Sequence, residues 1–177
     1  MENLEREYFS LIYYSFPTHV PVTANKKAPD KYQKITGQNL YSGAMNRFQR
    51  GNAVEWLHNY LLKEIPQTHW DWLKSEFVNV VYPIQLQLIF YAPLNYGTVK
   101  RIKGNIVWHP AQPDYIPNWD IDNQWIWNKL FCDVLQMVGL IPNDTVNYIS
   151  SFQITFVETP DLINRKLVFK LYTLINC

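Results

Sequence analysis

Acidic side chains gather along one segment of the chain, residues 120–144. Asp120 and Asp122 stand two positions apart, so their side chains point to the same side of an extended segment. Paired carboxylates supply the hard oxygen ligands that Mg²⁺ and Mn²⁺ prefer. Asp144 lies further along, in a turn that is free to fold back towards the pair. The spacing therefore predicts a divalent metal site with Asp120, Asp122 and Asp144 as its ligands.

The residues between these carboxylates have the pattern of a helix. Asp122 or Asn123 can cap its start, and Gly139 can end it after about Val138. At about 100° per residue, Lys129 and Asp133 return to within about 20° of the face that carries Asp122. A lysine beside metal-binding carboxylates can stabilise negative charge on a phosphoryl group. The stripe predicts phosphoryl chemistry at this helix.

Plain structural roles for the same residues remain open. An aspartate before a helix is commonly an N-cap, and one in a turn is commonly a turn residue. Lys129 and Asp133 are four residues apart, which also suits a surface ion pair. The spacing alone does not separate these roles from a metal site.

The elements that must position these residues follow from hydrophobic periodicity and turn signals. Strands are predicted at 8–16, 83–91 and 104–108, and at 151–157 and 167–174 as an antiparallel hairpin. Besides the helix up to Val138, helices are predicted at 53–65 and 70–77, and the proline-rich residues 110–118 are predicted to form a loop. This order predicts an α+β fold in which helices pack on a small mixed β-sheet.

Length and composition fit one domain over residues 1–177, because 47% of the residues are hydrophobic and only 18% are charged. No apolar run is long enough for a transmembrane helix, and the first residues lack a signal-peptide pattern. Two cysteines make no disulfide framework, and Cys132 is expected to be a small core residue. The histidines show no metal-ligand spacing and are expected to be ordinary surface or interface residues. We expect a cytoplasmic protein with no membrane partner.

Basic residues concentrate outside the acidic segment. The formal net charge is only +1, but residues 17–52 carry six basic residues against Asp30 alone, so their local charge is 6 − 1 = +5. We interpret 17–52 as a flexible basic segment. The candidate contacts to nucleic-acid phosphates are Lys26, Lys27, Lys31, Lys34, Arg47, Arg50, Lys100, Arg101 and Lys103. Solvated loop charge is the alternative interpretation.

Taken as a set, the motif residues resemble the RusA family of Holliday-junction resolvases. The family pattern runs Asp-x-Asp-Asn, Lys, Asp-x-Leu, Gly, Asp-Asp and Val, on a loop, a helix and a turn that two strands follow. The corresponding residues here are Asp120, Asp122, Asn123, Lys129, Asp133, Leu135, Gly139, Asn143, Asp144 and Val146. The resemblance covers residues 83–174, which we take as the motif-bearing core.

The resemblance implies a RusA-like fold and a homodimer that nicks four-way DNA junctions with Mg²⁺, or with Mn²⁺ in its place. Asp120, Asp122 and Asp144 would then bind the metal, and Lys129 would be the catalytic lysine. Asn123, Asp133 and Asn143 would have supporting roles. The implied setting is the cytoplasm of a bacterium or of a phage-infected cell, where the enzyme would act in recombination and repair.

Two departures from the family pattern keep other functions open. The family lysine follows the Asp-x-Asp-Asn asparagine by three residues, whereas Lys129 follows Asn123 by six, and Asn143 replaces the first acid of the Asp-Asp pair. A DNA-binding relative without catalytic activity would accommodate both departures. A structural or assembly protein is the third candidate, because Trp119, Trp125 and Trp127 could form an interface.

Overall fold

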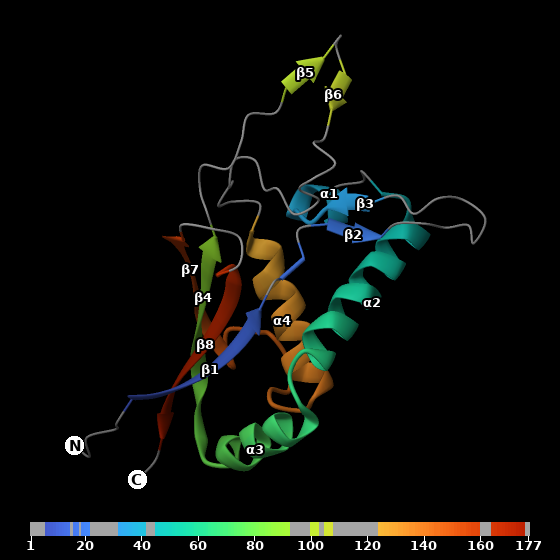
Figure 1. Ribbon diagram of the computed structural model, residues 1–177. Coiled ribbons are helices and arrows are strands. Elements are labelled where there is room, and N and C mark those ends of the chain that lie inside the picture. Colours follow the sequence, from blue (N-terminus) through green and yellow to red (C-terminus); the bar gives the residue numbers. More distant parts are fainter. Residues whose placement is uncertain are drawn as a thin grey trace.

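The computed structural model of the 177-residue chain describes residues 6–14, 16–17, 19–21, 32–41, 45–92, 100–102, 105–107, 124–159 and 164–175 (Figure 1). The strands are β1 (Arg6–Tyr14), β2 (His19–Pro21), β3 (Tyr32–Lys34), β4 (Val80–Ala92), β5 (Lys100–Ile102), β6 (Asn105–Val107), β7 (Ile149–Glu158) and β8 (Lys166–Ile175). The helices are α1 (Gly37–Tyr41), α2 (Arg47–Lys63), α3 (Gln67–Phe77) and α4 (Trp125–Met137).

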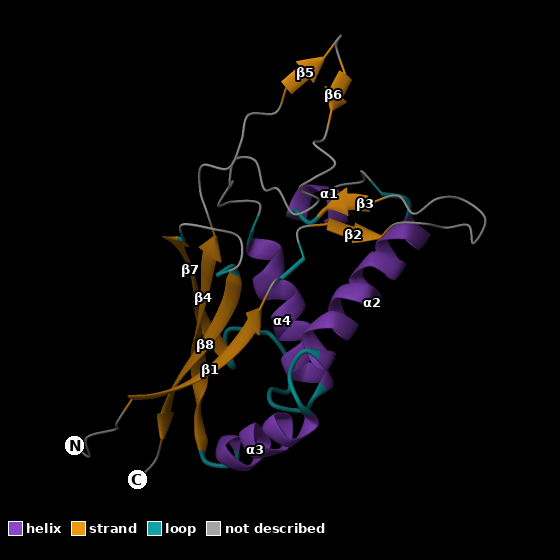
Figure 2. Cartoon of the chain, viewed as in Figure 1, coloured by secondary structure: helices purple, strands orange, loops and turns teal. Residues whose placement is uncertain are grey.

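A mixed four-stranded sheet forms the centre of the fold, in the order β1-β8-β4-β7. β8 runs antiparallel to both β1 and β4, whereas β7 runs parallel to β4. Two short antiparallel ladders, β2 with β3 and β5 with β6, stand apart from this sheet (Figure 2). The predicted α+β class with a small mixed sheet is confirmed.

The predicted hairpin of 151–157 with 167–174 is wrong. Both segments are strands, β7 and β8, but β4 lies between them and pairs with each. β4 is an inner strand that pairs on both sides, and its side chains at Leu86, Leu88 and Phe90 are all buried. Alternating apolar residues show which face of a strand is buried, but they do not show which strand lies beside it.

The core lies between one face of the sheet and the helices. Figure 1 shows α4 and α2 on the same side of the sheet, with α4 nearer to it. The buried ring of Phe131 on α4 stacks on Phe169 of β8 with 3.8 Å between ring centroids, and Tyr13 of β1 meets Phe169 edge-on at 5.7 Å. Cys132 is buried in the same core, as predicted. These contacts fix α4 firmly against the sheet.

Helix α2 begins well before the predicted start at residue 53. Asn46 and Gln49 form a reciprocal capping box, in which Gln49 N donates to Asn46 Oδ1 at 2.9 Å and Asn46 N donates to Gln49 Oε1 at 3.3 Å. Arg47 and Arg50 therefore lie on the first turns of a helix. The described part of the basic segment 17–52 also contains β2, β3 and α1, so this segment is not irregular throughout.

Other predicted elements agree with the structure to within a few residues. The strand predicted at 8–16 is β1, the strand at 83–91 lies within the longer β4, and the helix at 70–77 lies within α3. In the described part of the chain, no helix is both long enough and apolar enough to cross a membrane. The predicted loop at 110–118 lies outside the described residues.

Candidate functional site

Helix α4 has one stripe of solvent-accessible side chains between buried ones. Trp125, Lys129 and Asp133 follow one another at intervals of four residues and reach the surface, whereas the residues around them are buried. The prediction that Lys129 and Asp133 share a helix face is confirmed. The helix has Gln124 as its N-cap, rather than the predicted Asp122 or Asn123, and Gln124 makes no capping hydrogen bond through its side chain.

A tight turn after α4 carries the next acidic residue, Asp144. Gly139 has φ +76°, a backbone conformation that glycine adopts readily, and Leu140 N donates to Leu135 O at 2.8 Å to close the helix. Asn143 Oδ1 then accepts hydrogen bonds from Thr145 N at 3.0 Å and from Thr145 Oγ1 at 2.7 Å. Asn143 therefore shapes the turn that presents Asp144.

Lys129 joins the two acidic residues that the described structure places beside it. Its Nζ lies 3.0 Å from Asp133 Oδ1 and 3.4 Å from Asp144 Oδ2, and it donates a hydrogen bond to each. The other oxygen of Asp133, Oδ2, lies 3.3 Å from Nε2 of His58 on α2. This last contact is at ion-pair distance but does not form a hydrogen bond. We call His58, Lys129, Asp133 and Asp144 the charged cluster.

The two carboxylates raise the pKa of Lys129. Partial burial alone would lower the pKa of its amine, but the hydrogen bonds and negative charge of Asp133, and then of Asp144, outweigh burial and raise the pKa above the usual lysine value. The charges of the cluster also affect the pKa of Tyr41 on α1. Burial chiefly raises the pKa of its phenol, and the charge of Asp133 raises it further, whereas Lys129 and Arg50 lower it. The ammonium group of Lys129 is therefore held between two carboxylates at the surface of α4.

The buried thiol of Cys132 lies close enough to Asp133 and Asp144 for their charges to affect its pKa. Burial, followed by the negative charge of Asp144 and Asp133, raises the pKa of Cys132 to about 12. A thiol with this pKa is uncharged at neutral pH and is a poor nucleophile. Cys132 therefore contributes packing to the site rather than nucleophilic chemistry.

An aromatic pair continues the stripe towards the N-terminus of α4. The rings of Trp125 and Tyr41 lie 5.8 Å apart with an interplanar angle of 40°, and both side chains are partly exposed. The indole of Trp125 packs so closely on Gly37 that a Cβ atom there would lie 2.5 Å from its Nε1. Trp127, by contrast, is buried in the core. Of the two tryptophans, only Trp125 lies next to the charged cluster.

The structure brings together only part of the predicted site. Lys129, Asp133 and Asp144 meet, and Asn143 supports the turn, whereas the predicted residues Asp120, Asp122 and Asn123 lie outside the described part of the chain. Within residues 124–159 and the other described ranges, no three His, Cys, Asp or Glu side chains converge as metal ligands. Of the three predicted metal ligands, the structure therefore describes Asp144 alone, in contact with Lys129.

The predicted phosphate contacts fall on separate elements. Arg47 is exposed, and Arg50 is partly exposed, in the first turns of α2, while Lys34 belongs to β3 and Lys100 and Arg101 belong to β5. The remaining candidates, Lys26, Lys27, Lys31 and Lys103, lie outside the described residues. Of these basic residues, Arg50 lies close enough to Tyr41 to lower the pKa of the Tyr41 phenol. The phenol is also affected by Asp133 and Lys129 of the charged cluster.

His58 is the member of the cluster that was not predicted from the sequence. No spacing along the chain links it to α4, and only the packing of α2 beside α4 brings it to Asp133. One sequence signal did exist. His58 lies on the apolar stripe formed by Val54, Leu57 and Leu61, so it is a polar residue on the buried side of a helix.

A shallow cleft of about 460 Å³ lies elsewhere, between the end of α3, the start of β4 and the end of α4. Phe77, Tyr82 and Leu140 are among the residues that line it, and none of the charged cluster does. The cleft is therefore separate from the candidate site.

No known family model matches the sequence, and no curated protein matches it. The resemblance to the RusA family therefore depends on the motif residues alone.

Proposed function

We propose that this protein is a metal-dependent, structure-selective endodeoxyribonuclease that nicks four-way DNA junctions. One observation carries the proposal: Lys129 Nζ lies between Asp133 Oδ1 and Asp144 Oδ2, at 3.0 Å and 3.4 Å. The RusA resemblance assigned catalysis to Lys129 and metal binding to Asp144. Their contact across a helix and a turn fifteen residues apart in sequence supports that assignment.

Among the described residues, the proposed cation site has one carboxylate, that of Asp144, an oxygen ligand of the kind that Mg²⁺ and Mn²⁺ prefer. Asp144 is partly exposed, with a side-chain exposure of 39%, so its carboxylate is accessible from solvent. In the proposal, Asp144 holds Mg²⁺ or Mn²⁺ together with Asp120 and Asp122. The bound cation supplies a water of lowered pKa for hydrolysis of the phosphodiester.

Lys129 acts on the substrate in this proposal. Asp133 and Asp144 raise the pKa of its ammonium group, and its side chain is 40% exposed. It can therefore reach a phosphate from the surface and stabilise the charge that develops there. Asp133, one turn further along α4, accepts a hydrogen bond from the ammonium of Lys129 and holds it in place.

Recognition of the DNA would come mainly from backbone charge and junction shape. Arg47 and Arg50 are the candidate phosphate contacts on α2, the helix that also carries His58. Two copies of the chain would present two sites to the two symmetric strands of a junction. This activity suits recombination or repair in the cytoplasm of a bacterial or phage-infected cell.

A catalytically inactive DNA-binding relative is the second candidate. It is favoured by the turn after α4, where Asn143 supplies a neutral side chain whose Oδ1 already accepts two hydrogen bonds from Thr145. Such a relative would bind junctions without cutting them.

Nicking by the wild type that is lost in the variant Asp144→Asn distinguishes these candidates. We expect the variant to bind a synthetic four-way junction as the wild type does, and to lose about 100-fold or more in Mg²⁺-dependent nicking rate, because one anionic ligand is lost. Asp71→Asn is the matched control, since Asp71 is an exposed carboxylate on α3 that accepts a hydrogen bond from Gln67. Equal nicking by the Asp144 variant and the wild type would refute the proposed site.

A further inference from the structure

His58 belongs to a chain of contacts that crosses three elements. The chain runs from His58 on α2 to Asp133 and Lys129 on α4, and from there to Asp144 in the following turn. The successive distances are 3.3, 3.0 and 3.4 Å. No link of this chain joins residues closer than four positions apart, so packing and helix geometry together create it.

Burial falls along this chain from its inner to its outer end. The side chains of His58 and Asp133 are 17% and 23% exposed, whereas those of Lys129 and Asp144 are 40% and 39% exposed. The Nε2 atom of His58 is shielded from solvent. The contact of His58 with Asp133 is therefore the more buried end, and the contact of Lys129 with Asp144 is the end that is more exposed to solvent.

Both oxygens of Asp133 are engaged, each with a different partner. Oδ1 accepts from Lys129 Nζ, and Oδ2 lies against His58 Nε2. Rotation of the carboxylate would break both contacts together, so His58 restricts the orientation in which Asp133 can hold the ammonium. Lysine needs such restriction, because its four-carbon stem is flexible and its ammonium group is not directional.

We propose that His58 is a positioning residue that acts through Asp133 to aim the ammonium of Lys129 at Asp144 and at the substrate phosphate beside it. The proposal rests on the proposed nuclease function for its effect on cleavage. Its structural part, the dependence of Lys129 on His58, does not depend on any activity.

The test compares His58→Ala and His58→Gln with the wild type in Mg²⁺-dependent nicking of a four-way junction. We expect His58→Ala to lower kcat about 10- to 100-fold, the range found when a partner that orients a functional side chain is removed. KM and junction affinity should stay within about twofold. His58→Gln should recover most of kcat, since its amide N–H can donate to Asp133 Oδ2. A residue that only joined α2 to α4 would change stability without this separation of kcat from KM.

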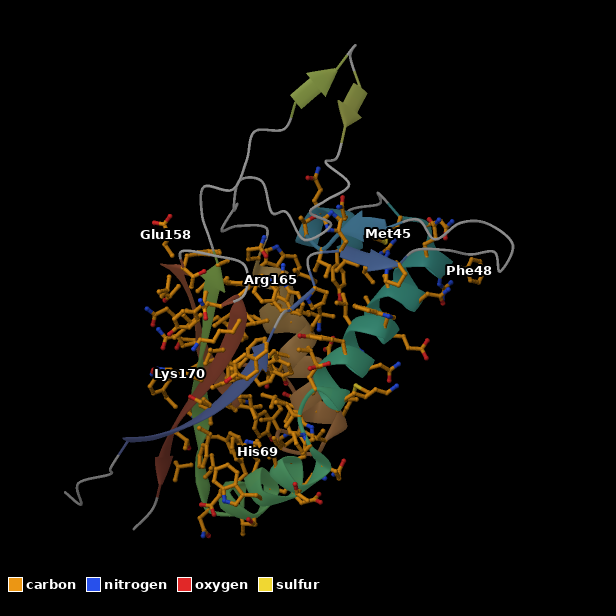
Figure 3. All side chains as sticks on the ribbon, viewed as in Figure 1. Met45, Phe48, His69, Glu158, Arg165 and Lys170 are labelled. Atoms are coloured by element: carbon orange, nitrogen blue, oxygen red, sulfur yellow. The ribbon has the colours of Figure 1, made fainter. Side chains whose placement is uncertain are left out.

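The matched control is His69→Ala. His69 lies on α3, at the lower end of the molecule in Figure 3, and its ring packs against Trp72 with 5.1 Å between centroids. Like His58, it is partly buried, with an Nε2 atom shielded from solvent. We expect kcat of this variant to match the wild type. A drop equal to that of His58→Ala would overturn the proposal.

Non-additivity gives a second check on the same variants. Because His58 acts through Asp133, His58→Ala should lower kcat no further when Asp133 is already alanine. If the double variant loses kcat by the product of the two single losses, the two residues act independently and the proposal is overturned.

A spectroscopic measurement keeps the proposal separate from the nuclease activity. The ¹⁵N resonance of Lys129 Nζ, assigned by its loss in Lys129→Met, should move in His58→Ala and stay in place in His69→Ala. If the wild type cuts no junction, the proposed function fails but this shift still tests the positioning. An unmoved resonance in His58→Ala overturns the positioning whatever the activity.

Discussion

At the scale of single residues, the centre of the account is one ammonium group held by two carboxylates. Lys129, Asp133 and Asp144 could be predicted as a group, because helix geometry places the first two on one face and a turn returns the third. His58 could not be placed there, because its partner lies 75 positions further along the chain (133 − 58 = 75) and only tertiary packing joins them. A polar residue on the apolar stripe of a helix is expected to have a polar partner from another element, because a buried polar group without one is costly.

The protonation of Lys129 leads to a prediction about pH. The folded protein raises the pKa of Lys129 above its usual value of about 10.4, so its contribution to stability is complete at neutral pH and is lost as the pH rises through the raised pKa. Lys129→Met should cost at most about 1 kcal/mol, because the pair is partly exposed.

This cost should stay constant between about pH 6 and pH 9 and shrink only above the usual lysine pKa. Urea unfolding of the wild type and of Lys129→Met across this range measures the difference. A difference that disappears already below pH 9 would show that the carboxylates do not hold the ammonium.

At the scale of the elements, α4 and its turn were predicted well and the start of α2 was not. Gly139 ends α4 at positive φ, which agrees with the glycine predicted as its terminator. The start of α2 was missed because the capping box of Asn46 and Gln49 precedes the apolar periodicity and lies in the basic segment 17–52, which was interpreted as flexible. A capping signal outweighed composition, because it satisfies backbone donors that a loop would leave to water.

The contact of α1 with α4 can be tested at Gly37. A methyl group at this position would lie 2.5 Å from Trp125 Nε1, so the indole beside the charged cluster would have to move. We expect Gly37→Ala to destabilise the fold by about 1–3 kcal/mol, the usual cost of an added group in a packed place. Urea unfolding measures the cost, and the tryptophan emission spectrum should shift with it.

Gly51→Ala is the matched control, because Gly51 lies in α2 with no atom within 4 Å of its added methyl group. Alanine there should leave the stability unchanged or raise it by up to about 1 kcal/mol, since glycine is a poor helix former. Destabilisation of both variants to the same degree would show that the packing of Trp125 on Gly37 is not the cause.

At the scale of the whole molecule, the sequence predicted the class of the fold but not the order of its strands. Binary patterns identified the four main strands and the α+β arrangement, because burial of one face imposes alternation. The same patterns placed β7 and β8 side by side, whereas β4 separates them. Strand order depends on pairing between segments far apart in the sequence, and alternation within one strand does not specify its partner.

The arrangement of the whole molecule gives the site its stability. Helix α4 is held by the sheet through Phe131 and by α2 through His58, and it carries Lys129 at its surface (Figure 1). A catalytic side chain on a helix that is packed on two sides is more exactly placed than one on a loop. The proposed nuclease would therefore keep its lysine on the rigid part of the fold.

The most direct test of the account is to incubate the wild-type protein with a synthetic four-way junction, with and without Mg²⁺, beside a linear duplex of the same sequence. The account predicts paired, symmetric nicks in the junction alone, and only with the metal. Binding of the junction without nicks, in Mg²⁺ and in Mn²⁺, would contradict the nuclease and leave the DNA-binding relative. If the protein neither binds nor nicks the junction, the four-way junction is not a substrate of the charged cluster.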